Sequence, residues 1–173
     1  MKLVRLTVAA LVLIVVTATA AVAQQVIYVV RHAERADSAP AAGQAMTAAA
    51  NDPPLSAAGH ARAARLATML RSADIWQIVA TEFQRTRQTA APLAKALNLE
   101  VTTAPAREPA ALLAHIREAK GNVLVVGHSN TVPELLKALG VKAAIAIPDS
   151  EYDNLFIVTR PATGEPLLAR LRF

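Results

Sequence analysis

The chain of 173 residues contains no cysteine, and its aromatic residues are few: one Trp, two Tyr and three Phe. The lack of cysteine excludes a disulfide framework and a lipid attached through a thiol, so the fold must be stable through its apolar core alone. The scarcity of aromatic rings leaves little for nucleic-acid bases to stack on, and the basic residues are dispersed along the chain. These absences argue against a nucleic-acid partner.

The first 23 residues have the organisation of a secretory signal peptide. A basic start precedes an apolar stretch from Val8 to Val16, and the small-x-small sequence Ala21-Val22-Ala23 follows. This order predicts cleavage between Ala23 and Gln24 and a periplasmic or secreted mature domain of residues 24–173. After cleavage no stable association with a membrane is expected. Retention of the leader as a membrane anchor is the alternative, since the apolar stretch can be extended to nearly the length of a span.

Removal of the leader leaves 150 residues, which fits one domain. Because Lys2 and Arg5 leave with it, the formal net charge falls from +5 to +3. This modest positive charge suits a small anionic substrate. The sequence leaves the oligomeric state open.

Apolar runs alternate with segments of helical character through most of the mature chain. Strands are expected at residues 26–30, 75–80, 99–103, 123–126, 155–159 and 167–171, and helices at residues 56–70, 81–97, 109–120 and 131–139. This alternation, with a strand pair at the end, predicts a three-layer α/β/α sandwich around a mostly parallel sheet. The Ala- and Pro-rich segment 36–54 is too long for an ordinary connection, so either a flexible lid or a disordered insert is expected there.

Capping residues mark where the expected helices start and stop. Ser56 precedes the first helix, and Gly121 and Gly140 follow the third and fourth, so these three residues are expected to act as caps. Two further helix starts fit the capping-box pattern, formed by Thr81 with Gln84 and by Thr131 with Glu134.

Charged residues and histidines follow the ends of three expected strands. The segment Arg31-His32-Ala33-Glu34-Arg35 follows the first strand, and Gly127-His128-Ser129-Asn130 follows the fourth. Arg85 and Arg87 come shortly after the second strand. The carboxyl ends of parallel strands are where open α/β sheets bind their ligands. His128 also precedes a helix, whose free N–H groups favour an anion. The three strand ends therefore predict an anion-binding site.

The two arginines after the second strand lie in the first turns of a helix, where the helix dipole disfavours cations. For Arg85 this placement makes sense if an anion is shared between the guanidinium group and the helix. For Arg87 a solvent-exposed helix face is an equal expectation. Arg35 follows His32 closely, so we expect it to line the site, with a surface salt bridge as the alternative.

Four motifs occur in the order that they have in the histidine phosphatase superfamily, the phosphoglycerate mutase-like fold: Arg31-His32-Ala33-Glu34, Leu55-Ser56-Ala57-Ala58-Gly59, Arg85 with Thr89-Ala90, and Gly127-His128-Ser129. The resemblance spans about residues 26–159, nearly the whole mature chain. The chain resembles a small single-domain phosphatase of this family, which implies hydrolysis of small phosphomonoesters without a cofactor. A phosphoglycerate mutase-like phosphotransferase and a noncatalytic phosphate-binding module of the cell envelope are the alternatives.

The resemblance implies a role for each residue at the strand ends. His32 would accept the phosphoryl group on a ring nitrogen and form a phosphohistidine intermediate. Arg31 and Arg85 would clamp the phosphoryl oxygens, and His128 would add a further donor. Phosphoryl transfer depends on positioning and positive charge, and planar guanidinium groups match phosphoryl oxygens in pairs. Neither clustered carboxylates nor histidines with metal-ligand spacing stand out in the sequence, so the arginines are expected to take the place of a metal ion.

The leaving oxygen needs a proton, which this family usually takes from a carboxylic acid. No acid directly follows His128, so Glu108, in the loop after the strand at 99–103, is the expected donor and Glu82 a poorer one. The alternative is that no strong acid exists, as in phosphohistidine phosphatases, whose leaving group is already good. The acidic segment 149–153 is expected to be a loop at the rim of the pocket.

Overall fold

The computed structural model describes residues 24–38, 52–161 and 163–173. The expected leader, residues 1–23, and most of the segment expected as a lid or insert lie outside the described residues. Within the described part of the chain, no helix is both long and apolar enough to cross a membrane.

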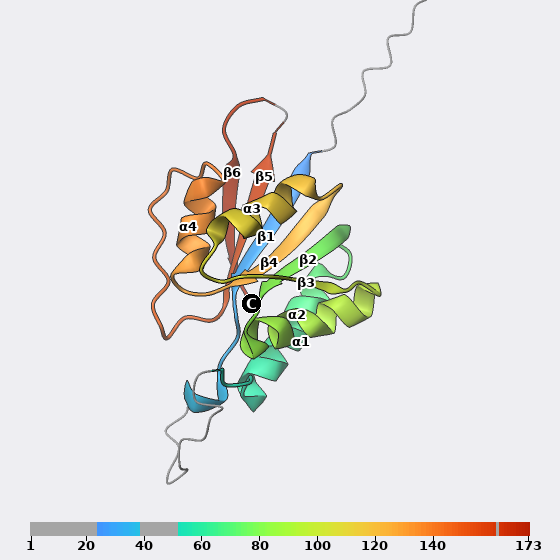
Figure 1. Ribbon diagram of the computed structural model, residues 1–173, viewed down its shortest axis with the longest axis vertical. Coiled ribbons are helices and arrows are strands. Elements are labelled where there is room, and N and C mark those ends of the chain that lie inside the picture. Colours follow the sequence, from blue (N-terminus) through green and yellow to red (C-terminus); the bar gives the residue numbers. More distant parts are fainter. Residues whose placement is uncertain (1–23, 39–51, 162) are drawn as a thin grey trace, which may run out of the picture.

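A six-stranded sheet in the order β3-β2-β4-β1-β5-β6 forms the centre of the molecule (Figure 1). Its strands are β1 (Gln25–Arg31), β2 (Ile75–Thr81), β3 (Val101–Ala104), β4 (Asn122–Gly127), β5 (Asn154–Arg160) and β6 (Leu167–Arg172). The first four strands run parallel to one another, and β5 and β6 complete the sheet through antiparallel pairing. The expected mostly parallel sheet, with a strand pair at its end, is confirmed.

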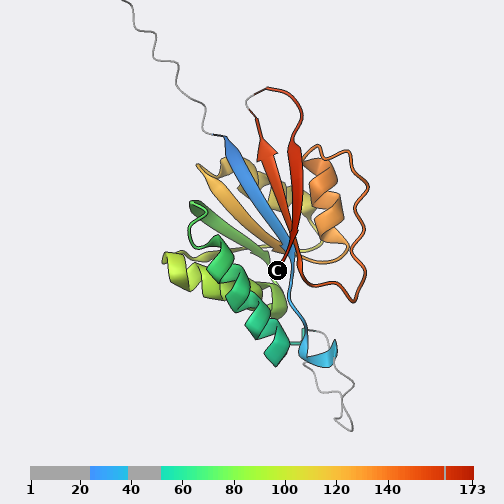
Figure 2. The ribbon, with the colours of Figure 1, turned by 180° about the vertical axis from the view of Figure 1, so that it is seen from behind.

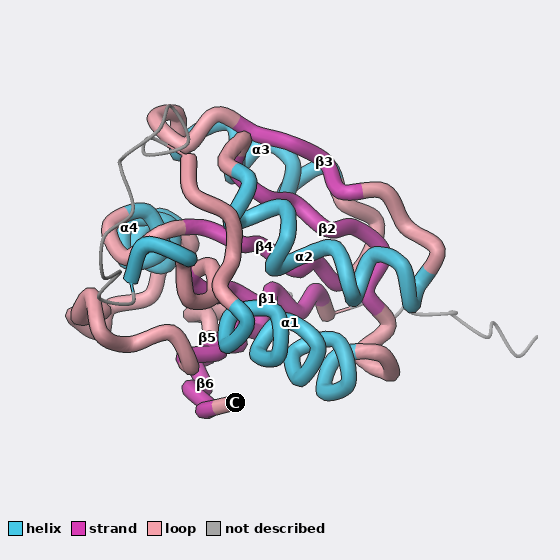
Figure 3. The backbone as a smooth tube through the Cα atoms, turned by 90° about the horizontal axis from the view of Figure 1, so that it is seen from below, coloured by secondary structure: helices cyan, strands magenta, loops and turns pink. Residues whose placement is uncertain are grey.

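The helices of the described residues cover both faces of the sheet. Helices α1 (Ala57–Leu70) and α2 (Gln84–Leu97) lie on one face, and α3 (Pro109–Glu118) and α4 (Thr131–Ala138) lie on the other (Figures 1 and 3). Figure 2 shows α1 and α2 side by side from behind. A short 3-10 helix, η1 (Ala36–Ser38), follows the end of β1. The three-layer α/β/α arrangement expected from the sequence is therefore confirmed.

The central strands are buried on both faces, which explains their uninterrupted apolar sequences. Along β4, Val123 and Val125 belong to the core beneath α3 and α4. The alternate residues Leu124 and Val126 belong to the core beneath α1 and α2. Because successive side chains of a strand point to opposite faces, each central strand contributes to both cores. The register also places the ends of β1 and β4 together, since Arg31 pairs with Gly127.

The start of α1 is fastened to the end of β1. Ser56 caps the helix as expected, because its Oγ accepts a hydrogen bond from the N–H of Gly59 at 3.1 Å. The N–H of Ser56 donates to the carbonyl oxygen of Glu34 at 2.9 Å. Gly59 lies so close to this carbonyl group that an added Cβ would be 2.2 Å from its oxygen. The helix can approach the strand end this closely only because residue 59 has no side chain.

Gly59→Ala is expected to destabilise the protein by about 1–3 kcal/mol, because its methyl group would push α1 away from a rigid backbone carbonyl. Helix propensity alone predicts the opposite sign, a gain of about 1 kcal/mol for alanine inside a helix. Denaturant unfolding measures the difference, with Ala58→Ser at the exposed neighbouring position as the control. An alanine variant as stable as the wild type would contradict the close contact.

The expected capping box at Thr81 is wrong. Thr81 does not begin a helix, because it is the last residue of β2 and pairs with Ala104 of β3. Helix α2 begins three residues later, at Gln84. The N–H of Gln84 donates to Oδ1 of Asp52 at 2.9 Å, so the cap comes from a residue far away in the sequence.

The expected capping box at Thr131 is also wrong. The N-cap of α4 is Asn130, without a side-chain hydrogen bond, so Thr131 is the first helical residue. Gly140 does follow the end of α4 as expected, with a positive φ of 94°. Gly121 is not a helix cap, because α3 ends at Glu118. An added Cβ at Gly121 would lie 2.4 Å from the ring of Trp76, so the glycine is explained by this contact.

The two ends of the segment 36–54 lie side by side. Arg35 and Leu55 form an antiparallel β-bridge, and the N–H of Ala36 donates to the carbonyl oxygen of Pro54 at 2.9 Å. The residues on either side of the undescribed part of this segment are therefore joined next to the end of β1. Asp52, which caps α2, belongs to the returning end.

Candidate active site

The three strand ends singled out in the sequence meet at one edge of the sheet, which Figure 3 shows nearly end-on. A pocket of about 290 Å³ lies there. Its polar and charged lining comes from Arg31, His32, Arg35, Arg85, Arg107, His128, Ser129, Asn130, Thr131 and Asp149. A larger hollow of about 650 Å³ beside α4 contains neither histidine nor arginine in its lining. The smaller pocket is therefore the candidate active site.

His32 follows β1 directly, and its side chain is only 3% exposed. Its backbone N–H donates to the carbonyl oxygen of Gly127 at 2.9 Å, and the N–H of Ala33 donates to Oγ1 of Thr89 at 3.0 Å. The ring nitrogen Nδ1 lies 2.8 Å from the carbonyl oxygen of Ala33. A carbonyl oxygen only accepts, so Nδ1 carries the hydrogen and Nε2 carries the lone pair of the neutral ring.

The electrostatic surroundings keep His32 neutral. Burial, together with the nearby His128, Arg31 and Arg85, lowers the pKa of His32 to about 3, against the hydrogen bond to Ala33. A neutral imidazole with its lone pair on Nε2 has the form that a nucleophile requires near pH 7.

His128 follows β4, and its side chain is 8% exposed. Its ring centroid lies 5.3 Å from that of His32, and its Nε2 lies 2.8 Å from Oγ1 of Thr81. Its backbone N–H donates to the hydroxyl of Thr131 at 2.9 Å, which fixes the turn into α4. Burial, together with the Arg85 and Arg31 charges, lowers the pKa of His128 to about 4, and Glu82 opposes them.

Both buried histidines make stability depend on pH. An unfolded histidine binds a proton below a pKa of about 6.5, whereas the folded rings stay neutral down to a pKa of about 3 for His32 and about 4 for His128. Their stabilising effect is therefore complete above pH 6.5 and is lost as the pH falls through this window. For each ring, the free energy of unfolding is expected to fall by about 2 kcal/mol as the pH falls from 7 to 5.

Denaturant unfolding of the wild type, His32→Asn and His128→Asn at pH 7 and pH 5 measures this contribution. Each variant should lose about 2 kcal/mol less than the wild type over this interval, because its pH-dependent ring is gone. Equal losses in all three proteins would show that neither ring is held neutral by the fold.

Arg31, the last residue of β1, is held from several sides and is 6% exposed. Its Nη1 donates to the carbonyl oxygens of Pro148 and Glu151 at 2.9 and 3.1 Å. Its guanidinium carbon lies 4.2 Å from the centre of the Tyr152 ring, and Nη2 lies 3.5 Å from Oδ1 of Asp149. Burial lowers the pKa of the Arg31 guanidinium. The loop before β5 thus fixes the direction in which Arg31 points.

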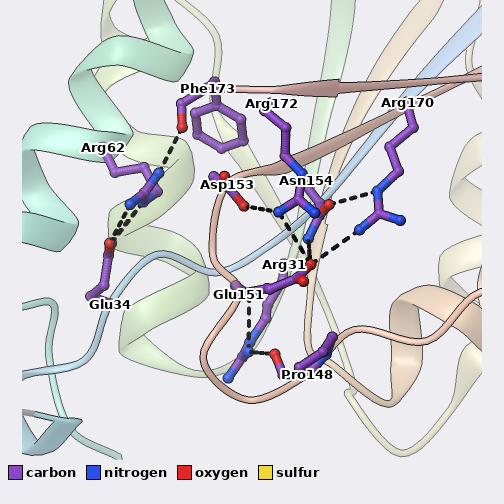
Figure 4. A network of polar contacts seen from close by, with 10 residues as sticks. All are labelled: Arg31, Glu34, Arg62, Pro148, Glu151, Asp153, Asn154, Arg170, Arg172 and Phe173. Carbon is purple, nitrogen blue, oxygen red and sulfur yellow. Dashed lines mark hydrogen bonds and ion pairs between the residues drawn. The ribbon is translucent and has the colours of Figure 1, made fainter.

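A polar network fixes this loop in turn (Figure 4). The Glu151 carboxylate accepts from Nδ2 of Asn154 at 2.9 Å and from Nη2 of Arg170 at 3.1 Å. Arg172 forms ion pairs with both Glu151 and Asp153. The antiparallel pair β5 and β6 therefore supports the loop that holds Arg31.

Arg85 reaches the pocket from the first turn of α2, and its side chain is 11% exposed. Its guanidinium carbon lies 4.3 Å from the centre of the Phe83 ring, whose centroid is 5.2 Å from that of His128. Its Nη1 lies 3.5 Å from Oδ1 of Asp52 without forming a hydrogen bond. Arg87, on the same helix, is exposed and lies outside the lining of this pocket.

Buried donors without acceptors distinguish this pocket. Nε of Arg31 and both Nε and Nη1 of Arg85 are buried and have no hydrogen-bond partner. Nε of Arg35 is in the same state, although it lies 2.9 Å from Oδ1 of its ion-pair partner Asp37. Unsatisfied buried donors are costly, and a ligand with several anionic oxygens would satisfy them. Arg35 fits both sequence alternatives, since it lines the pocket and also forms a salt bridge.

The structure does not bring Glu108 into the pocket. Glu108 is an exposed N-cap of α3 without a side-chain hydrogen bond, and it is not among the lining residues. The Glu82 carboxylate accepts from the N–H of Ala106 at 2.7 Å and also lies outside the lining. Among the described residues, Asp149 is the one carboxylate in the lining, and its Oδ1 accepts from Oγ of Ser129 at 3.2 Å.

Glu34 stands next to the histidine motif but faces away from the pocket. Its carboxylate accepts from Nε of Arg62 at 2.9 Å and from Nη2 at 2.6 Å, in a fork-shaped pair (Figure 4). Arg62 also donates to the carbonyl oxygen of Phe173 at 2.6 Å. Glu34 therefore ties the segment after β1 to Arg62 of α1, and Arg62 in turn contacts Phe173 after β6.

Comparisons with known proteins concern the family and the fold. A sequence model of the histidine phosphatase superfamily (branch 1) matches residues 27–108. No curated protein sequence matches the chain. Among solved structures, the putative phosphohistidine phosphatase SixA from Agrobacterium tumefaciens is 24% identical, with a TM-score of 0.61 over 86% of this chain and 98% of that chain.

Two further structures have similar folds. The putative alpha-ribazole-5'-P phosphatase from Escherichia coli str. K-12 is 16% identical, with a TM-score of 0.65 over 86% of this chain and 96% of that chain. The protein histidine phosphatase SixA complexed with tungstate is 21% identical, with a TM-score of 0.63 over 85% of this chain and 96% of that chain.

The fold of this chain, a sheet with helices on both faces, is similar to the fold of these proteins. In its matched sequence and in its fold, the chain is similar to the histidine phosphatase superfamily. The matched sequence includes the ends of β1 and β2, with His32 and Arg85. His128 lies beyond the match, and the fold itself brings it to the site.

Proposed function

We propose that this protein is a phosphatase that hydrolyses phosphomonoesters through a phosphohistidine intermediate on His32. The observation that carries the proposal is the combination of a neutral His32 with a lone pair on Nε2 and buried guanidinium groups without acceptors in the same pocket. The phosphoryl oxygens would complete the hydrogen bonds of Arg31 and Arg85. An N–P bond would form as the ester P–O bond breaks, and water would then hydrolyse the N–P bond.

The arginines supply the positive charge that the transition state needs. Charge spreads over the equatorial oxygens during phosphoryl transfer, so fixed cations around them provide most of the catalysis. Arg31 is oriented by two carbonyl groups and the Tyr152 ring, and Arg85 is stacked on Phe83. We propose that these groups act without a metal ion, and that the enzyme is exported after cleavage before Gln24.

A panel of phosphorylated compounds tests the reaction class. Phosphate release from alkyl esters, aryl esters and a phosphohistidine peptide is measured in EDTA and without added metal. Release from the esters in EDTA supports the proposal, whereas release from the peptide alone favours a phosphohistidine phosphatase. Transfer to an acceptor alcohol without release would favour a phosphotransferase. Tight phosphate binding without turnover would favour a noncatalytic binding module. Sequencing the N-terminus of the protein from a periplasmic extract tests cleavage before Gln24.

We propose Asp149 as the proton donor to the leaving oxygen in place of Glu108, because Asp149 lines the pocket beside Arg31. Donation then leaves a carboxylate that can accept a proton from the water of the second step.

Asp149→Asn is expected to lower kcat on an alkyl phosphate by about a hundredfold, because general acid catalysis matters most for a poor leaving group. On an aryl phosphate with a strongly acidic phenol as leaving group, the same variant should keep its rate. Glu108→Gln is the matched control and should leave both rates unchanged. The reverse pattern would restore Glu108 as the donor.

A further inference from the structure

Two buried threonine hydroxyls lie behind the pocket, and both side chains are fully buried. Oγ1 of Thr86, in α2, lies 2.9 Å from the carbonyl oxygen of Thr81 and 2.7 Å from that of Phe83. Carbonyl oxygens can only accept, so the single hydrogen of the Thr86 hydroxyl is directed toward them. The Thr86 oxygen remains free to accept.

This assignment determines the next two hydrogen bonds. Oγ1 of Thr81 lies 3.0 Å from Oγ1 of Thr86 and 2.8 Å from Nε2 of His128. Since the Thr86 hydrogen is already used, Thr81 donates to Thr86 and accepts from Nε2–H of His128. If Thr81 donated to His128 instead, the Thr81 and Thr86 hydroxyl oxygens would lie 3.0 Å apart with no hydrogen between them. A neutral imidazole has one N–H, so the lone pair of His128 lies on Nδ1.

We propose that Thr81 and Thr86 are positioning residues that fix His128 as a proton acceptor toward the phosphoryl group. Nδ1 has no hydrogen-bond partner among the described residues, and His128 lines the pocket. With Nε2–H committed to Thr81, neutral His128 has no N–H to offer a phosphoryl oxygen. The inference rests on the proposed phosphatase function, and it reverses the donor role expected for His128 from the sequence.

The charges around His128 decide where the proton comes from. The ring lies near three cations: Arg31 at the end of β1, Arg35 shortly after it, and Arg85 in α2. It also lies near one acid, Glu82, which follows β2. His32, its neighbour across the pocket, is neutral. Burial and the surplus of positive charge keep the free ring unprotonated, and a phosphoryl dianion would offset the positive charge. The proton therefore enters with the ligand, either on a singly protonated phosphoryl group or from solvent onto Nδ1.

The first test reads the ring nitrogens of the free enzyme directly. Long-range ¹H–¹⁵N correlation spectra at pH 8 distinguish a protonated ring nitrogen from an unprotonated one. The expected result is a hydrogen on Nε2 and a lone pair on Nδ1 of His128. In Thr81→Val, which removes the hydroxyl with little change of shape, the tautomers should mix, whereas Thr81→Ser should retain the wild-type pattern. A wild-type ring with its hydrogen on Nδ1 would overturn the proposal.

The second test counts protons during binding of tungstate, a tetrahedral dianion that carries no proton at pH 8. Calorimetry in buffers of different ionisation enthalpy should show uptake of about one proton per bound tungstate, since Nδ1 must be protonated to donate. Thr81→Val should take up clearly fewer protons, because its His128 ring can carry the hydrogen on Nδ1 without a proton from solvent. Thr81→Ser should match the wild type.

The outcomes separate this inference from the proposed function. Equal proton uptake in Thr81→Val and the wild type would overturn the positioning role, even if both proteins hydrolyse esters. Failure of all variants to bind tungstate would argue against a phosphoryl pocket, and the spectra of the free enzyme would still decide the tautomer of His128. A structural role of Thr81 alone would change stability but neither the ring nitrogens nor the proton count.

Discussion

Replacing His32 by asparagine is expected to reduce phosphate release by roughly four orders of magnitude or more, because the nucleophile is lost. The asparagine amide can still donate to the carbonyl oxygen of Ala33, which accepts from Nδ1 of His32 at 2.8 Å. The turn after β1 thus keeps its hydrogen bond, and the guanidinium groups keep their positions. The variant therefore isolates the contribution of Nε2.

Rapid quenching with a radiolabelled ester checks the same assignment independently of the steady-state rate. Wild-type protein should carry label on His32 that is stable in alkali and released in acid, as expected for an N–P bond. His60→Asn, on an exposed position of α1, is the control and should label normally. Full turnover by His32→Asn, or label on another residue, would refute the proposed nucleophile.

Arg85→Lys is expected to lower kcat/KM by about a hundredfold to a thousandfold, although the charge is unchanged. Nε and Nη1 of Arg85 are the buried donors that a phosphoryl group would satisfy, and lysine offers one point charge in place of this fork. Lysine also lacks the planar group that stacks on Phe83. The loss should therefore affect the transition state more than the ground state.

Arg87→Lys provides the matched control, because it makes the same exchange two residues away on the exposed side of α2. Its kinetics should equal those of the wild type within a factor of about two, as usual for surface substitutions. Initial rates over a range of substrate concentrations give both variants' constants. If the two variants lost equal activity, the effect would belong to the helix and not to the Arg85 side chain.

The sequence predicted the architecture and the gathering of His32, Arg85 and His128 because both depend on short-range patterns. Continuous apolar runs indicated strands buried on both faces, and each functional residue follows such a run directly or within one helical turn. Parallel strands then carry these residues to a common edge without further information. The order of β1, β4 and β2 in the sheet completes the arrangement.

The parts that the sequence did not predict depend on contacts between distant residues. Thr81 fits a capping box by local pattern, but pairing with β3 keeps it in a strand and turns its hydroxyl toward His128. The cap of α2 comes from Asp52, which no spacing rule connects with Gln84. Asp149 and Tyr152 reach Arg31 through a loop whose position depends on β5 and β6. Local sequence propensity does not predict contacts between residues that lie far apart in the sequence.

The bridge between Arg35 and Leu55 joins the two ends of the intervening chain, so the length of that chain can differ without moving the ends. Doubling the length of a flexible loop changes the free energy of its closure by only about 0.6 kcal/mol, so residues added between the two bridge positions would cost the fold little. His32 would not move, because its turn is fixed by Gly127 and Thr89 on the far side of the bridge. The bridge thus separates the reaction centre from the chain between residues 35 and 55, so a change of length there would leave the geometry around His32 intact.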